Sequence, residues 1–282
     1  MLWLCLLLIA VGLVISLPIT AVLVRLGHKL QTYDGVGVEG QVKAAARRVP
    51  NTGGIAIFLG VALPIAAGLA LLWPMATSDA VPGWLPDAVV PHLAGVAERG
   101  PGVLALLAAL TVLHVVGLID DRRPLGPIVK LGVMLACIGG VMWAVPGTRL
   151  LVAADGYVGG AWLSVLVTVA WFVVVTNAMN FMDNMDGLAG GVTAVAGSCF
   201  LAATLGISQA EGGQWFVAAA MALLVGAVLG FLVFNRPKAA IFMGDGGSLV
   251  IGFLLAFLTV RTTYVGGDGS GGWYSVLMPL AV

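Results

Sequence analysis

The sequence predicts an all-α fold, a polytopic membrane bundle with eight complete transmembrane helices and the start of a ninth. Two observations lead to this prediction. Hydrophobic side chains make up 60% of the 282 residues and charged ones only 9%, whereas a typical soluble domain has about 25% charged residues. The apolar residues also form stretches of about 20 residues, the length that crosses about 30 Å of hydrocarbon. A soluble globular enzyme is therefore excluded.

Eight apolar stretches precede the C-terminal region, and a ninth begins at Trp273. They lie near residues 2–24, 53–73, 103–119, 127–145, 161–178, 189–207, 214–234 and 248–265. The first stretch lacks the basic start of a secretory signal peptide and is longer than its usual apolar region, so we expect it to remain as a helix. We expect residues 1–282 to form a single integral-membrane domain.

The positive charges between these stretches predict the orientation of the bundle. When alternate loops are assigned to opposite sides, one side receives ten Lys and Arg residues and the other receives three. Because cytoplasmic loops are enriched in Lys and Arg, we expect the N-terminus to lie outside. The loops expected in the cytoplasm are 25–52, 120–126, 179–188 and 235–247. The totals of 13 basic and 13 acidic residues leave no basic excess for a nucleic-acid partner.

Carboxylates gather at the predicted cytoplasmic ends of the helices. They are Asp120, Asp121, Asp183, Asp186 and Asp245. A single Asp at a membrane surface could be a helix cap, but acids close to hydrocarbon are costly, and three loops supplying them on one side indicate a functional site. An ion-coupled transporter would also use such acids, but near the bilayer midplane. These five lie at one surface, which favours an enzyme.

The residue types around the acids favour a metal-dependent diphosphate site. Oxygen ligands without Cys or His pairs suit Mg²⁺, or alternatively Mn²⁺. Magnesium uses one or two protein carboxylates and completes its shell with water and substrate phosphates, so Asp mixed with Lys and Arg fits a diphosphate. The Gly-rich turn at 243–248 precedes a predicted helix and would add backbone N–H donors for phosphate oxygens.

Four segments carry a more specific resemblance. They are RRVPNTGG at 47–54, DDRRPL at 120–125 with Lys130, NAMNFMDNMDGL at 177–188, and NRPKAAIFMGDGGS at 235–248. In order and spacing they resemble the cytoplasmic motifs of the polyprenyl-phosphate N-acetylhexosamine-1-phosphate transferase family, over about residues 47–260. The resemblance implies Mg²⁺-dependent transfer of a sugar 1-phosphate from a UDP-N-acetylhexosamine to undecaprenyl phosphate, with release of UMP.

The resemblance also implies roles for individual residues. Asn180 and Asp245 correspond to the metal ligands, and Asp120, Asp121 and Asp183 to catalytic positions. The residues expected to contact substrate are Lys130, Asn177, Asp186, Asn235, Arg48 and Gly244. For Arg48, contact with lipid headgroups is an equal alternative.

The chemistry of the acceptor is compatible with these roles. A phosphate monoester has a second pKa near 6, so the lipid phosphate is largely dianionic at pH 7. The approach of two anions is then the main obstacle, and we expect Lys130 and the metal to neutralise the diphosphate while Asp120 or Asp121 orients or deprotonates the attacking phosphate. A covalent aspartyl-phosphate is the alternative route. The single-step route is favoured because the lipid phosphate is already a competent nucleophile.

The motifs at 49–54 and 177–188 resemble the branch that uses UDP-N-acetylglucosamine more than the alternative, phospho-N-acetylmuramoyl-pentapeptide transferase. The family normally continues with further helices and a basic, His-containing cytoplasmic loop, which we expect a chain ending at Val282 to lack. His114, in the third stretch, is interpreted as an interhelical hydrogen-bonding residue. We expect a multi-pass protein of the cell (inner) membrane with its site on the cytoplasmic face, and a homodimer is left open.

Overall fold

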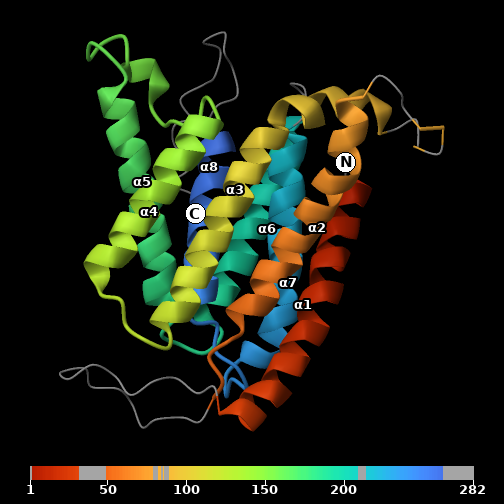
Figure 1. Cartoon of the computed structure of the whole chain (residues 1–282), viewed down its shortest axis with the longest axis vertical. Coiled ribbons are helices and arrows are strands. Elements are labelled where there is room, and N and C mark those ends of the chain that lie inside the picture. Colours follow the sequence, from red (N-terminus) through yellow and green to blue (C-terminus); the bar gives the residue numbers. More distant parts are fainter. Residues whose placement is uncertain are drawn as a thin grey trace.

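The computed structural model describes residues 2–31, 49–78, 82–83, 85, 89–208 and 214–262. Within these ranges the chain forms eight α-helices and two short 3-10 helices, and the only β-pairing is a single bridge between Asn51 and Phe242 (Figure 1). The elements are α1 (Leu2–Leu30), α2 (Gly54–Ala76), η1 (Val90–His92), α3 (Leu93–Asp120), α4 (Pro127–Ala144), η2 (Val152–Ala154), α5 (Trp162–Met182), α6 (Leu188–Ser208), α7 (Trp215–Asn235) and α8 (Asp245–Thr262).

All eight helices are long and apolar enough to cross a membrane. This confirms the predicted polytopic helical bundle. The predicted ninth helix, from Trp273, lies outside the described residues.

Several helices extend beyond the apolar stretches that predicted them. Helix α3 begins at Leu93, ten residues before the predicted start at 103, so Glu98 and Arg99 are helical. Helix α5 continues to Met182, and α8 already begins at Asp245. Hydropathy marks the part of a helix that fits hydrocarbon, whereas backbone hydrogen bonding continues the helix into the polar boundary. As a result, the predicted site residues lie on helix ends more often than in loops.

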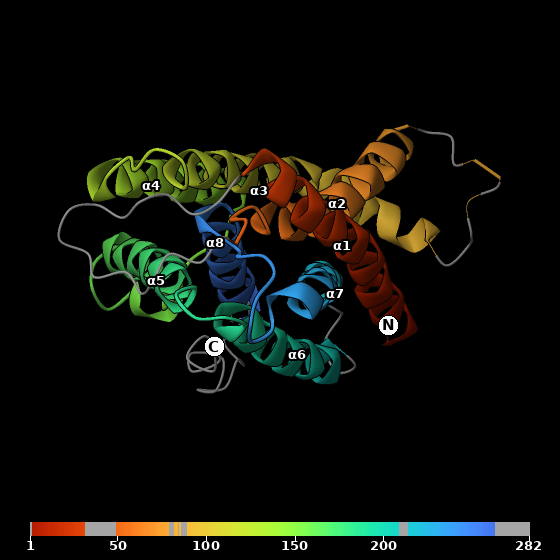
Figure 2. The same ribbon diagram turned by 90° about the horizontal axis from the view of Figure 1, so that it is seen from below.

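Helix α8 lies at the centre of the bundle. It packs against α2, α3, α5, α6 and α7, and Figure 2 shows it enclosed by its neighbours. Every residue from Gly246 to Val260 is buried. Glycines allow this close packing, since a Cβ added to Gly252 would lie only 2.6 Å from the Cα of Thr176 in α5.

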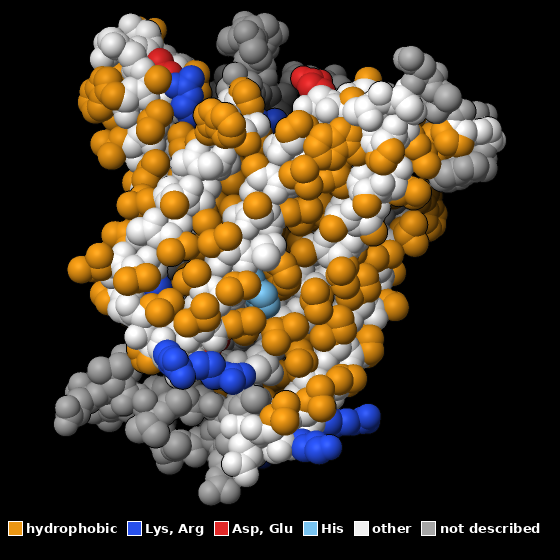
Figure 3. Space-filling view, viewed as in Figure 1, with side chains coloured by type: hydrophobic (Ala, Val, Ile, Leu, Met, Phe, Trp, Pro, Cys, Tyr) orange, Lys and Arg blue, Asp and Glu red, His pale blue; other side chains and the backbone are white. Residues whose placement is uncertain are grey.

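The basic side chains divide unequally between the two ends of the bundle. In Figure 3, Lys and Arg side chains gather mainly at the lower end, where α1 and α3 end and α8 begins. The described basic residues at this end are Arg25, Lys29, Arg122, Arg123, Lys130, Arg236 and Lys238. This is the end that the positive-inside rule predicts to face the cytoplasm.

Candidate active site

Two of the predicted motifs pair with each other at the lower end of the bundle. The N–H of Phe242 donates to the carbonyl of Pro50 at 2.8 Å, and the N–H groups of Gly53 and Gly54 donate to the carbonyls of Phe242 and Met243 at 2.9 and 2.8 Å. This short parallel pairing joins the entry of α2 to the segment that enters α8. It thereby places the 49–54 motif beside the first turn of the central helix.

A cluster of charged and amide side chains from four helices lies beside this pairing. The Lys130 ammonium of α4 lies 3.0 Å from Asp120 Oδ2 of α3 and 3.0 Å from Asp245 Oδ2 of α8. The Asn180 amide of α5 donates to Asp245 Oδ1 at 2.7 Å, and Asp120 Oδ1 accepts from the N–H of Leu125 at 2.7 Å. The structure therefore brings together Asp120, Lys130, Asn180 and Asp245, which the sequence analysis had placed in one site.

Asp121 faces a different set of groups from its neighbour Asp120. Its Oδ1 accepts from the backbone N–H of Asp245 at 3.0 Å and from the Asn51 amide at 3.1 Å, and its Oδ2 accepts from the N–H of Gly246 at 3.4 Å. Burial raises the pKa of Asp121 to about 7, although the backbone hydrogen bonds from Asp245 and Gly246 oppose the rise. Thus Asp120 forms an ion pair with the Lys130 ammonium, whereas Asp121 accepts hydrogen bonds from the backbone at the start of α8.

Several backbone N–H groups of the Gly-rich turn at 243–248 are bonded within the protein. The N–H of Gly244 donates to Asp183 Oδ2 at 3.0 Å, and the N–H groups of Gly247 and Ser248 donate to the carbonyl of Gly244 at 3.0 Å each. Gly244 has φ +74°, and a Cβ there would lie 2.5 Å from Asp121 Oδ2. The N–H groups that were expected to face phosphate are therefore already bonded here, that of Gly244 to a carboxylate and those of Gly247 and Ser248 to a carbonyl.

Asp186 and Asn235 bond to the backbone of neighbouring loops. Asp186 Oδ2 accepts from the N–H groups of Lys238 and Ala239 at 3.1 and 3.0 Å. Asn235 is 3% exposed; its amide donates to the carbonyl of Ile241 at 2.8 Å and its Oδ1 accepts from the N–H of Gly187 at 3.0 Å. Both residues thus tie the loop after α5 to the loop after α7.

Two further residues were expected to contact substrate, Asn177 and Arg48. The exposed Asn177 donates to the carbonyl of Val173 in its own helix at 2.7 Å, one turn before Asn180. Arg48 lies outside the described residues.

Two polar residues of the cluster were absent from the expected site. Asn51 is 9% exposed and donates to Asp121, while its Oδ1 has no hydrogen-bond partner among the described residues. Ser248 accepts from Asn180 at 2.9 Å and lies three residues after Asp245 on the same helix. In the sequence, the spacing of Ser248 from Asp245 and the place of Asn51 within the 49–54 motif could have indicated these two residues. Neither feature specifies which side chain each one bonds.

The donor set fits a hydrated Mg²⁺ or Mn²⁺ ion. The described residues contain no group of three or more His, Cys, Asp or Glu side chains able to hold a metal, but magnesium needs only one or two protein carboxylates. Asp245 and Asn180 offer oxygen-bearing side chains in direct contact. The Lys130 ammonium lies between Asp120 and Asp245 and already neutralises part of their negative charge.

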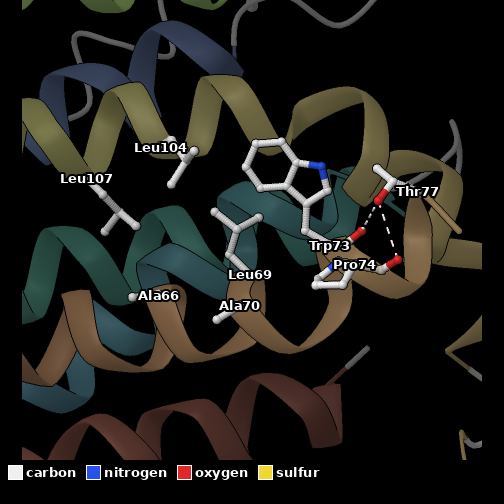
Figure 4. Close-up of a pocket in the computed structure, with 8 residues that line it drawn as sticks. All are labelled: Ala66, Leu69, Ala70, Trp73, Pro74, Thr77, Leu104 and Leu107. Atoms are coloured by element: carbon white, nitrogen blue, oxygen red, sulfur yellow. Dashed lines mark hydrogen bonds between the residues drawn. The ribbon is translucent and has the colours of Figure 1, made fainter.

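A separate hollow of about 500 Å³ lies between the C-terminal half of α2 and the middle of α3, away from the charged cluster (Figure 4). Its lining residues are Ala66, Leu69, Ala70, Trp73, Pro74, Thr77, Leu104 and Leu107. The hydroxyl of Thr77, the residue after α2, donates to the carbonyl of Trp73 in the last turn of that helix at 2.9 Å. The hollow is apolar and carries none of the cluster residues, so it is separate from the candidate site.

The fold and the site define a class, a multi-pass membrane protein with an Asp–Lys–Asn cluster where its helices end. Within that class the assignment is specific, because the sequence model of glycosyl transferase family 4 matches residues 103–263. The chain belongs to glycosyl transferase family 4, and the resemblance found in the motifs is confirmed at the family level.

The chain is similar to several curated relatives. It is 34% identical over 219 residues to the decaprenyl-phosphate N-acetylglucosaminephosphotransferase of Mycobacterium tuberculosis, covering 73% of this chain and 48% of the relative. It is 26% identical over 280 residues to a probable undecaprenyl-phosphate N-acetylglucosaminyl 1-phosphate transferase of Bacillus subtilis, covering 96% and 66%. It is 36% identical over 180 residues to the phospho-N-acetylmuramoyl-pentapeptide-transferase of Moorella thermoacetica, covering 59% and 55%. The chain thus spans 48% to 66% of the length of these relatives.

Proposed function

We propose that this protein transfers an N-acetylhexosamine 1-phosphate from a UDP-sugar to undecaprenyl phosphate at the cytoplasmic face of the inner membrane. The observation that carries the proposal is the convergence of Asp120, Lys130 and Asp245 on one point within a family 4 sequence. Two carboxylates and one ammonium leave a net negative charge, which suits a divalent cation that would in turn bind the anionic diphosphate close to the membrane surface.

In the proposed reaction, an oxygen of the lipid phosphate forms a bond to the sugar-bearing phosphorus of the UDP-sugar. The bond from that phosphorus to the bridging oxygen breaks, and UMP leaves. Lys130 neutralises the diphosphate, and Asp120, bonded to Lys130 at 3.0 Å, keeps the ammonium in place. A Mg²⁺ ion held by Asp245 and Asn180 would supply further positive charge to the diphosphate.

We favour N-acetylglucosamine as the sugar because relatives named for N-acetylglucosamine phosphotransfer match 73% and 96% of the chain. Phospho-N-acetylmuramoyl-pentapeptide transfer is the second candidate. It is supported by a relative of that name with 36% identity over 180 residues.

The experiment that tests the proposal uses purified protein in detergent with undecaprenyl phosphate and MgCl₂. Radiolabelled UDP-N-acetylglucosamine and UDP-N-acetylmuramoyl-pentapeptide are supplied in parallel, and label in a butanol-extractable lipid is counted with and without EDTA. We expect lipid product from UDP-N-acetylglucosamine and its loss with EDTA. Product from the pentapeptide substrate alone would support the second candidate, and product from neither would contradict the proposed function.

A further inference from the structure

One buried titratable side chain near the cluster has no part in the reaction described above. His114 lies in α3 and is 5% exposed. Its ring stacks on Phe58 of α2, with ring centroids 4.3 Å apart and ring planes 8° from parallel. Its Nδ1 lies 2.7 Å from the carbonyl oxygen of Gly246 in the first turn of α8, which agrees with its interpretation as an interhelical hydrogen-bonding residue. Since a carbonyl oxygen only accepts hydrogen bonds, Nδ1 carries the proton.

The hydrogen bond from His114 completes a set of polar contacts on two consecutive residues. Asp121 accepts from the N–H groups of Asp245 and Gly246 at 3.0 and 3.4 Å, and His114 donates to the carbonyl of Gly246. Both polar groups of the Gly246 residue are therefore bonded to α3 or to its C-terminal cap. Glycine has more backbone freedom than other residues because it has no side chain. These contacts therefore restrict backbone rotation at Gly246, where no side chain does so.

The close approach of α3 makes this arrangement specific. Gly117 lies one turn after His114, and a Cβ on Gly117 would lie 2.5 Å from the carbonyl carbon of Asp245. The two backbones are therefore in contact, and a shift in the first turn of α8 would move the Asp245 side chain directly. That side chain bonds Lys130 at 3.0 Å and Asn180 at 2.7 Å, so such a shift would lengthen or redirect both contacts.

We infer that His114 is a positioning residue that sets the affinity of the site for a divalent cation by fixing the first turn of α8, and thereby the direction of the Asp245 carboxylate. The inference rests on the proposed function, in which Asp245 holds the cation. His114 itself touches neither substrate nor metal in this role. What it contributes is the Nδ1–H donor, and the stacked ring keeps that donor aimed at Gly246.

Comparing four side chains at position 114 distinguishes the effect of the N–H donor from the effect of the ring. The native His has both, and His114→Phe keeps a ring for Phe58 but has no donor. His114→Asn keeps an N–H donor without the ring, because the Asn amide nitrogen lies about as far along the side chain as Nδ1. His114→Leu has neither. The matched control is His92→Phe, since His92 also packs against an aromatic ring, Trp215, with centroids 5.0 Å apart, but lies at the other end of α3.

The readout is binding of Mn²⁺ alone to the purified full chain, followed by electron paramagnetic resonance, with thermal unfolding of each variant measured alongside. We expect His114→Asn and His92→Phe to bind Mn²⁺ about as well as the native protein. We expect His114→Phe and His114→Leu to bind it roughly two- to tenfold more weakly, because that is the usual net contribution of one hydrogen bond. Two pairs differ in the donor and match in the ring, namely native with His114→Phe and His114→Asn with His114→Leu. Either pair decides the outcome, so failure of one variant to fold does not remove the test.

Two outcomes would overturn the inference. Affinity that follows the ring, with His114→Phe like the native protein and His114→Asn weakened, would assign His114 a packing role only. Equal affinity in all folded variants would show that the hydrogen bond does not affect the site. The measurement does not depend on turnover. If the variants bind Mn²⁺ in the expected order but the native protein makes no lipid product, the proposed reaction is contradicted, while the placing of the cation by Asp245, on which this inference depends, is retained.

Discussion

Helix α1 is more apolar than helix α8 but is much less buried. The most apolar window of α1 has a mean hydropathy of 2.7 but is 17% buried, whereas that of α8 has 1.3 and is 89% buried. In a soluble protein the more apolar helix would be expected inside. Here the lipid is as apolar as a leucine side chain, so hydropathy shows which helix tolerates lipid and does not show which helix lies in the centre.

Polar groups explain why α8 is the central helix. Asp245 and Ser248 bond to α4 and α5 through Lys130 and Asn180, and Thr259 accepts from the indole N–H of Trp171 at 3.0 Å. Such groups are costly in hydrocarbon and are favourable only where other helices supply partners. The helix that carries the site is therefore held in the interior by site residues at one end and by Thr259 near the other.

The largest expected effect concerns the polar end of α8. Asp245→Asn removes the charge that faces Lys130 and, in the proposed function, a metal ligand, so we expect turnover to fall by about 100-fold or more while expression is retained. Asp155→Asn is the matched control, because Asp155 also pairs with a cation, Arg149 at 2.9 Å, but at the opposite end of the bundle. Near-native activity of Asp245→Asn in the lipid-product assay would contradict the assignment of Asp245.

Truncating a leucine in each helix tests the contrast in burial. Leu254 in α8 is 0% exposed, whereas Leu7 in α1 is 59% exposed. Leu254→Ala should lower the free energy of unfolding by about 2–4 kcal/mol because it leaves a cavity, whereas lipid or detergent can fill the space left by Leu7→Ala, with a change below about 0.5 kcal/mol. Thermal unfolding in detergent measures both, and equal losses would show that α1 is not the peripheral helix.

Adding one methyl group tests the close packing around α8. Gly252→Ala would place a Cβ 2.6 Å from the Cα of Thr176, and we expect a loss of about 1–3 kcal/mol from overpacking. Gly132→Ala in the outer helix α4 is the matched control, since a Cβ there meets nothing within 4 Å. The control should unfold at the native temperature or slightly above it. An unchanged unfolding temperature for Gly252→Ala would contradict the contact.

A pH-dependent effect is expected at Asp121, which binds the first turn of α8. Its pKa rises from the usual 3.8 to about 7 in the folded protein, so between these values the folded state keeps a proton that the unfolded chain has released. Native stability should therefore fall as pH rises from about 4 to about 7 and then change no further on this account. Asp121→Asn does not titrate, so its unfolding temperature relative to the native protein, in metal-free buffer, should increase across this window. A pH-independent difference would contradict the raised pKa.

The sequence was sufficient to predict the eight helices because the length needed to cross hydrocarbon can be counted along the chain. Their ends were less predictable, as at α3, which begins at Leu93 instead of near residue 103. The order of the apolar stretches and the Lys and Arg between them predicted that Asp120, Asp121, Asp183 and Asp245 lie on one side of the membrane. Their partners could not be predicted this way, since Lys130 and Asp245 are 115 residues apart and the spacing along the chain does not determine which helix faces which.

The tertiary structure also changed what several predicted residues do locally. Asp186 and Asn235 bond loop backbone, and the Gly244 N–H that was expected to face phosphate donates to Asp183. The sequence by itself determined the membrane-spanning architecture and the chemical composition of the site, because both depend on residue type and on length. Only the packing decided that α8, with the lowest mean hydropathy of the eight described helices, lies at the centre, because that depends on which polar groups find partners.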